Sequence, residues 1–212
     1  GVSPRSSTPP AGSSDPVIEV DRGTADPAAL AACADATFAS DPAEAEVLYG
    51  VGQLGQDGNA PALVLRNPAG EVRVCDAAES GPPAVEPLPR ASEDQPVAFL
   101  TNGSASWDCE GDVLSGYQTT TWLLVHDGID SVQQRFVVDG RPGPWFSAGA
   151  RGGIAHLPAW LGPQTEGVEI VTEQRVLDPH GDVVPQDVWP RRQPLVGCPT
   201  GASTDDGDAQ IL

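Results

Sequence analysis

From Glu46 onward the chain alternates short apolar segments with turn residues, which is the pattern of β structure. Residues 46–54 and 62–67 are apolar runs separated by the polar loop "GQDGNAP". Val72 and Val74 alternate with charged neighbours, as one face of a strand requires. Similar runs at residues 97–100, 119–146 and 167–178 bring the total to about eight to ten short strands.

Four turn motifs predict where these strands reverse. Asp127-Gly128 and Asp139-Gly140 are typical of tight hairpins. "NPAG" at 67–70 and "DPHG" at 178–181 match position for position as Asx, Pro, any residue and Gly. Such a sequence suits a type I turn in which proline fixes the second position and glycine adopts a left-handed conformation. We therefore expect two similar corners.

The stretch 26–40, "DPAALAACADATFAS", predicts the only helix. Asp26 is a suitable N-cap, and Pro27 falls in the first turn, where helices accept proline. Leu30, Cys33 and Phe38 would line one apolar side over about three turns. Together with the strands, this predicts a mainly β fold, either an antiparallel β-sandwich or an open barrel, with one N-terminal α-helix.

Composition shifts divide the chain into three parts. Residues 1–16 are rich in serine and proline and predict a disordered linker, with a membrane anchor or signal peptide expected upstream. Residues 17–198 form the predicted β-rich ectodomain, and a division of it into two halves, 17–80 and 95–198, stays open. A proline-rich acidic connection joins these halves. Residues 199–212 predict an acidic flexible tail.

Four cysteines, Cys33, Cys75, Cys109 and Cys198, are far apart in the sequence and include no CxxC pair. This spacing disfavours zinc and thioredoxin-type sites and favours two structural disulfides, hence an oxidising compartment outside the cytoplasm. Three pairings are open. We favour Cys33–Cys75 with Cys109–Cys198, because each bond then closes one half of the chain.

The charge of the chain limits its partners. Asp and Glu number 30 against 11 basic residues, all arginine, which gives a net charge of −19. A surface this acidic repels phosphate backbones and anionic membranes. Nucleic acid is therefore excluded as a partner, and contact with a membrane is expected only through an upstream anchor. The absence of lysine is typical of a GC-rich coding sequence. The expected partner is an unidentified protein or a cell-wall component.

Candidate chemistry is sparse. Asp178, His180 and Asp182 stand at alternate positions and could hold a metal, but a turn tip would direct them apart into water, so we interpret "DPHG" as a corner. His126 and His156 are isolated, and neither HExxH nor GxSxG occurs. No catalytic residue, metal site or cofactor is predicted.

The tryptophans are the only candidate ligand-binding residues. Trp107 and Trp122 lie in strand-like segments and are expected in the core. Trp145, Trp160 and Trp189 lie in segments rich in proline and glycine. They could form a platform for sugars or peptides, or close the open ends of a sandwich, which we favour.

The segment from Gly128 to Val184 resembles the C-terminal β region of uncharacterised extracytoplasmic domains of high-GC Gram-positive bacteria. The resemblance rests on Val137–Gly140, Trp145-Phe146, Ala159-Trp160 and Asp178–Gly181 and covers about a third of the chain. It implies a membrane-anchored or secreted domain without an assigned activity, and it transfers no catalytic residue.

The sequence therefore favours a non-enzymatic extracytoplasmic module of a cell-envelope protein, which binds, senses or has a structural role. Two alternatives stay open. One is a secreted glycan hydrolase that uses carboxylates, and the other is a carbohydrate- or peptide-binding module that uses the loop tryptophans.

Overall fold

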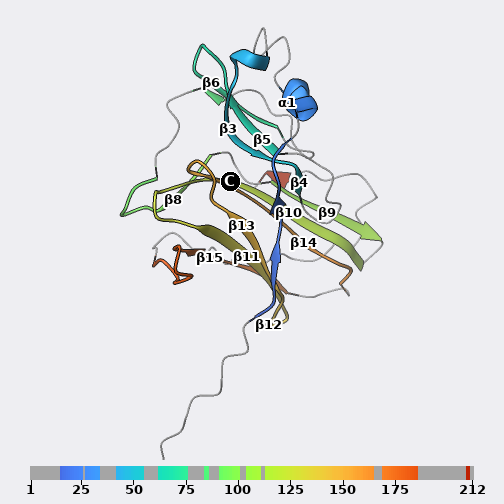
Figure 1. Ribbon diagram of the computed structural model, residues 1–212. Coiled ribbons are helices and arrows are strands. Elements are labelled where there is room, and N and C mark those ends of the chain that lie inside the picture. The colour runs from blue at the N-terminus through green and yellow to red at the C-terminus, as the bar shows by residue number, and fades with distance from the viewer. Residues whose placement is uncertain are drawn as a thin grey trace, which may run out of the picture.

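The computed structural model describes residues 15–25, 27–33, 42–54, 62–75, 84–85, 91–100, 104–110, 113–164, 169–185 and 209–210 (Figure 1). In these residues the fold is mainly β, as predicted. The two helical elements are α1 (Pro27–Cys33) and the 3-10 helix η1 (Pro42–Glu44). No described helix is long and apolar enough to cross a membrane.

Three larger sheets and one small ribbon contain the described strands. The β11 sheet has the order β1 (Val17–Glu19), β13 (Trp145–Gly149), β11 (Ser131–Val138) and β12 (Arg141–Pro142), with β15 (Ile170–Leu177) also beside β11. The β10 sheet has the order β14 (Ile154–Leu161), β10 (Val113–Val125), β9 (Ser104–Glu110) and β16 (Ala209–Gln210), with β8 (Val97–Phe99) also beside β10. The β5 sheet has the order β3 (Glu46–Val51), β5 (Ala62–Arg66), β6 (Glu71–Cys75) and β7 (Ala84–Val85). The ribbon pairs β2 (Asp21–Arg22) with β4 (Gln53–Leu54).

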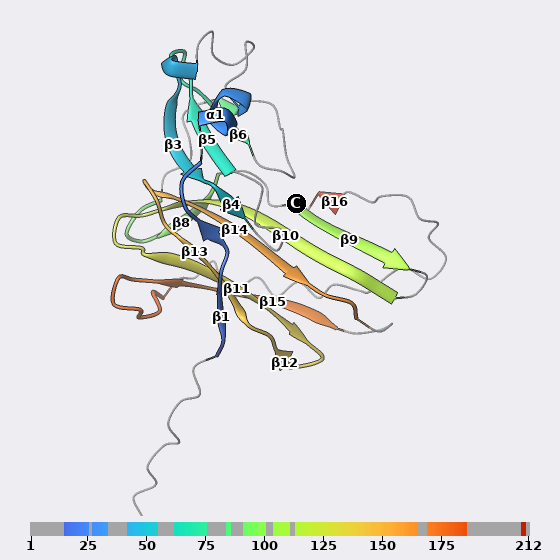
Figure 2. The ribbon, with the colours of Figure 1, turned by 45° about the vertical axis from the view of Figure 1, so that its right-hand side comes forward.

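The three sheets are stacked, with the β10 sheet in the middle (Figures 1 and 2). On one of its faces Tyr117, Leu123 and Leu157 share a core with Phe136 and Phe146 of the β11 sheet. On its other face Trp122 and Ile154 share a second core with the β5 sheet. Strand β10 contributes to both cores because successive side chains of a strand point to opposite faces of the sheet.

Helix α1 covers the far side of the β5 sheet. Leu63 and Leu65 of β5 pack there against Cys33 and Leu30, while Val64, between them in sequence, faces the β10 sheet. Strand β5 is therefore buried on both faces, which explains its nearly continuous apolar sequence.

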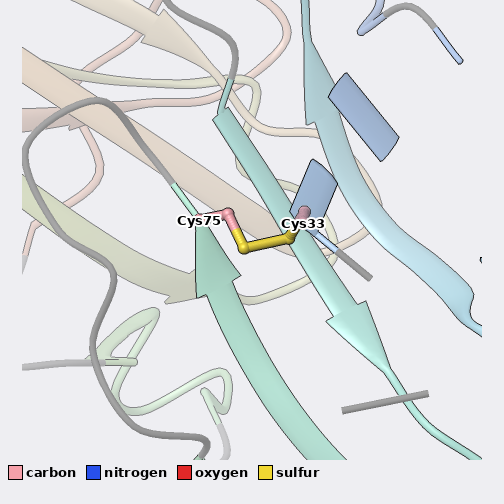
Figure 3. The surroundings of a disulfide bond; sticks show 2 residues. All are labelled: Cys33 and Cys75. Atoms are coloured by element: carbon pink, nitrogen blue, oxygen red, sulfur yellow. A yellow bond between two sulfur atoms is a disulfide. The ribbon is translucent and has the colours of Figure 1, made fainter. Parts of the chain in front are cut away.

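The predicted disulfide between Cys33 and Cys75 is confirmed (Figure 3). It joins the last residue of α1 to the last residue of β6, 42 positions later. None of the described cysteines is free. The predicted Cys109–Cys198 bond involves Cys198, which lies outside the described residues, so that bond stays a prediction.

Three expectations about the fold need correction or completion. The described strands number sixteen rather than eight to ten; several have only two residues, whereas β10 has 13. The predicted run began at residue 119 and missed the first part of β10, because Ser115, Gly116 and Gln118 interrupt its apolar pattern. Strand β1 pairs in parallel with β13, so the fold is not purely antiparallel. Seven residues of the expected helix are present in α1, and its expected end at 34–40 lies outside the described residues.

No described sheet closes into a barrel. The two predicted halves also share contacts throughout: β1 lies in a sheet of the second half, and the second core contains residues of both halves.

Candidate functional site

Among the described residues, the first candidate for a functional group is a buried carboxylate at the point where the sheets meet. Asp21, on β2, has a side chain only 2 % exposed. Its carboxylate accepts hydrogen bonds from the backbone N–H of Gly149, at 3.0 Å, and from the hydroxyl of Tyr49, at 3.3 Å. The Nε atom of Arg151 lies 3.6 Å away. We call Asp21, Tyr49 and Arg151 the junction cluster, because they come from three separate parts of the chain.

A tight turn places Arg151 in this cluster. Arg151 and Ile154 exchange two backbone hydrogen bonds around Gly152 and Gly153, whose φ angles are 58° and 77°. The positive φ angles favour glycine at both positions. A Cβ atom on Gly152 would lie 3.0 Å from the carbonyl oxygen of Leu48, so the turn fits closely against β3. The segment "GARGGIA" at residues 149–155 thus contains a structural turn.

An aromatic stack continues the junction cluster into the second core. The rings of Tyr49 and Trp122 meet edge to face, with centroids 5.5 Å apart. His156 lies directly opposite Trp122 in the β10–β14 pair, so both side chains are on the same face, and their ring centres are 3.9 Å apart. Trp122 and His156 are 0 % and 1 % exposed. His156 is therefore a core histidine, as its isolation in the sequence suggested.

Electrostatics favour a structural role for the junction cluster. Burial raises the pKa of Asp21, although the hydrogen bond from Gly149 and the charge of Arg151 act in the opposite direction. Burial, together with the nearby Asp21 carboxylate, raises the pKa of Tyr49 far above its usual value. Tyr49 therefore stays protonated and serves as a donor. The three groups satisfy one another and hold β2, β3 and the Arg151 turn together.

Asp21 provides a prediction that separates charge from hydrogen bonding. Asp21→Ala should lower the free energy of unfolding by about 1–3 kcal/mol, since it leaves the donors on Gly149 and Tyr49 without this acceptor and removes the ion pair with Arg151. Asp21→Asn keeps an acceptor for Gly149 and should cost less at pH 7. Because the folded-state pKa of Asp21 is raised above the unfolded value, the folded state binds this proton more tightly. The stability of the parent relative to Asp21→Asn should therefore increase as the pH falls through the folded pKa. Urea unfolding of both chains between pH 7 and pH 4 measures this, and a relative stability that decreases on acidification would contradict it.

A second polar cluster lies on the face of the β11 sheet that points away from the β10 sheet. The guanidinium carbons of Arg135 and Arg175 lie 4.4 and 4.0 Å from the centre of the Trp145 ring. Arg135 also forms ion pairs of 2.8 Å with Glu173 and with Asp15. Burial and the charge of Arg135 lower the pKa of Arg175. We call Arg135, Trp145 and Arg175 the arginine–tryptophan cluster.

Cross-strand register assembles this cluster. Arg135 lies opposite Glu173 in the β11–β15 pair, and Arg175 lies opposite Gln133, whose side-chain oxygen accepts a 2.7 Å hydrogen bond from Arg175 Nε. Trp145 is 4 % exposed, and its indole Nε1 has no hydrogen-bond partner among the described residues. The arrangement can hold a carboxylate, as it does with Asp15. It is the candidate binding site of the described part of the chain.

No known family, curated protein or solved structure matches the chain.

The predicted ligand-binding tryptophans occupy different environments. Trp145 is buried under the two arginines, in a strand rather than a loop. Trp160, at the end of β14, is half-buried with its ring centre 4.6 Å from that of Phe146. The structure does not bring these two rings into direct contact in any described interaction, and Trp189 lies outside the described residues. Trp122 is in the core as predicted, and the side chain of Trp107 is not described.

The "DPHG" motif is a corner, as predicted. Gly181 N–H donates to the carbonyl of Asp178 at 2.9 Å, and Gly181 has a φ of 84°. The Asp178 carboxylate accepts hydrogen bonds from the backbone N–H groups of Asp182 and His180, and the one from Asp182 contributes most to lowering its pKa. The "NPAG" corner repeats this pattern, with Gly70 at the same φ of 84° and Asn67 accepting from Glu71 N–H. Among the described residues, no three His, Cys, Asp or Glu side chains are grouped as a metal site.

Substitutions in this corner should separate backbone geometry from ligand binding. Gly181→Val should lower the free energy of unfolding by about 1–2 kcal/mol, because a β-branched residue is strained at positive φ. His180→Ala should change it by no more than about 0.5 kcal/mol. Thermal unfolding with and without zinc or calcium provides the control, since an ion that binds only the folded state raises the melting temperature. A melting temperature raised by zinc in the parent but not in His180→Ala would show that the corner is a metal site.

Sequence reasoning missed the junction cluster and the two arginines over Trp145. Tyr49 follows Asp21 by 28 positions, Arg151 follows Tyr49 by about a hundred, and no sequence motif links the three residues. Alternation along 131–138 and 170–177 could have placed Arg135 and Arg175 on polar strand faces, but not beside Trp145.

Proposed function

We propose that the chain is a non-enzymatic extracytoplasmic module of a cell-envelope protein, which binds, senses or has a structural role. The observation that carries this proposal is the Cys33–Cys75 disulfide, which ties α1 to a strand of the β5 sheet. Structural disulfides persist in oxidising compartments and are rare in a reducing cytoplasm.

The use of the polar groups supports a non-enzymatic role. Asp21 and Tyr49 bind one another and backbone groups, and the raised pKa of Tyr49 keeps its hydroxyl protonated. Arg135 binds two carboxylates at once. Side chains that satisfy one another across strands stabilise a fold, whereas general acid–base catalysis needs a group free to exchange a proton with a substrate.

The candidate partner is a protein or cell-wall component recognised at the arginine–tryptophan cluster. Arginine binds carboxylates through paired N–H donors, and Trp145 supplies a flat apolar surface beneath it. Trp160 and Trp189 remain candidates for a carbohydrate- or peptide-binding role. A carboxylate-dependent glycan hydrolase is the alternative of another class.

Two measurements test the proposal. The first compares the chain exported to an oxidising compartment of a bacterial host with the chain kept in the cytoplasm. We expect the exported chain to be folded with Cys33–Cys75 closed and the retained chain to be reduced and less stable. Equal stability of both would remove the main support for an extracytoplasmic location.

The second measurement is co-sedimentation with purified cell-wall material, with release of reducing sugar measured in the same tubes. Sedimentation without sugar release, reduced by Arg175→Ala, supports a binding module. Thr172→Ala, on the same strand with its side chain on the opposite face of the sheet, is the matched control. Sugar release would establish the hydrolase instead.

A further inference from the structure

We propose that the N-terminal arm, residues 15–22, exchanges between two copies of the chain, so that the arm of each copy seats beside β13 of the other. The proposal is independent of the proposed function. Exchange of identical elements conserves the contacts of the closed form outside the pivot, so it forms a dimer at little energetic cost. We call the surface that the arm covers the seat; it consists of β13, Arg135 and the junction-cluster residues Tyr49 and Arg151. The partner is a second copy because the seat contacts this particular arm at several points.

The backbone of the arm is held as a short added strand. Val17, Ile18 and Glu19 lie opposite Trp145, Phe146 and Ser147 in parallel register. Two further backbone bonds extend the pairing at its ends: Trp145 N–H donates to the Pro16 carbonyl at 2.9 Å, and Val20 N–H donates to the Ser147 carbonyl at 3.0 Å. Addition of an extended segment to a sheet edge is a common mode of recognition between chains.

The side chains of the arm make the seat specific. Asp15 pairs with Arg135 of the arginine–tryptophan cluster at 2.8 Å, at one end of the arm. Asp21 enters the junction cluster at the other end. Between them Val20 is 3 % exposed, and both Val20 and Ile18 pack on the core of the β10 and β11 sheets. The seat therefore binds a segment with a carboxylate at each end and two inward-facing apolar side chains between them.

A single residue can serve as the pivot. Gly23 has a φ of +70°, and in the described part of the chain no heavy atom beyond its two chain neighbours lies within 4 Å of the position a Cβ would occupy there. From Thr24 onward the chain is held closely, since the Thr24 carbonyl oxygen lies 2.5 Å from the ideal Cβ position of Gly52. The arm can therefore swing away by a change at Gly23 from a left-handed to an extended backbone, while the rest of the fold is kept. The change affects the 2.9 Å hydrogen bond that the Gly23 carbonyl accepts from Arg151, and in the dimer β2 of each arm pairs with β4 of the other copy.

Gly23→Ala tests this pivot, with Gly70→Ala as the matched control. Both glycines have a positive φ, and both have open space at the Cβ position, so alanine is strained at each without a clash. At Gly23 the strain disfavours only the closed form, and the exchanged dimer relieves it at two pivots. At the lower end of the left-handed penalty, about fivefold per pivot, the ratio of dimer to monomer should rise about 25-fold. Light scattering after size-exclusion chromatography measures this ratio, and Gly70→Ala should leave it unchanged.

A cysteine pair across the seat identifies which arm fills it. With Glu19→Cys and Ser147→Cys, residues opposite each other in the parallel register, oxidation of the isolated dimer should link two chains, and oxidation of the monomer should link one chain to itself. Asp127→Cys, in an exposed turn, measures random cross-linking. Peptide mapping then confirms that Cys33–Cys75 is intact.

Three outcomes would overturn the proposal. Gly23→Ala could stay monomeric at every concentration up to the solubility limit. The two alanine variants could dimerise equally, which would show general destabilisation rather than exchange. The dimer could carry its engineered disulfide within each chain, which would place the interface elsewhere.

Discussion

Replacing both Cys33 and Cys75 with alanine is expected to lower the free energy of unfolding by about 4 kcal/mol. The disulfide closes a segment of 42 positions, and in the chain-entropy model a cross-link of this span strongly restricts the unfolded ensemble. Alanine is preferable to serine because Cys33 is buried with Leu63 and Leu65, where a hydroxyl would have no suitable partner. Urea unfolding of the double variant and the parent gives the difference directly.

Each single variant provides a control for this experiment. Cys33→Ala alone also opens the bond but leaves a free thiol at Cys75, so mass mapping must show no new pairing with Cys109 or Cys198. Mapping of the parent without reductant tests the Cys109–Cys198 prediction at the same time. An unchanged unfolding midpoint in the double variant would mean that the bond does not constrain the fold.

Trp122→Ala is expected to cost about 3–5 kcal/mol. The indole is 0 % exposed, and it fills the layer between the β10 and β5 sheets, with Tyr49 edge-on and His156 stacked against it. Removing it leaves a cavity where the two sheets meet, so the β5 sheet should also lose much of its attachment. Urea unfolding gives the cost, and hydrogen exchange should show amides of β3, β5 and β6 exchanging before those of β11 and β15.

Trp160→Ala is the matched control for this substitution. Trp160 is half-buried and contacts the first core at its edge, so its loss should cost less and should not uncouple the β5 sheet. A loss below about 1 kcal/mol in Trp122→Ala would show that the sheets are held together mainly by other contacts.

Both predictions concern features that the sequence indicated only in outline. The four cysteines pointed to disulfides, but the choice of Cys33–Cys75 depended on an argument about halves of the chain. That pairing is confirmed, although the halves themselves share sheets and cores. The burial of Trp122 followed from its apolar neighbours, whereas its contacts with Tyr49 and His156 did not follow from any local pattern.

The turns show why local features were predictable. "NPAG" and "DPHG" adopt the same geometry because one proline, one glycine and one Asx side chain determine the backbone within a few residues. Asp139-Gly140 is a two-residue hairpin turn in which both residues have positive φ, and aspartate and glycine tolerate this. Such determinants act over short distances and can be recognised in the sequence.

The sequence by itself determined the mainly β class, the corners and the buried character of β5 and Trp122, because these depend on residue type and periodicity. The tertiary structure alone decided that β1 runs parallel to β13, that Asp21 lies beside Tyr49 and Arg151, and that two arginines cover Trp145. These arrangements join positions as far apart in the sequence as Asp21 and Arg151, which are separated by 130 residues. Many strand pairings satisfy the same alternation equally well, and the choice among them depends on the summed packing of all three sheets.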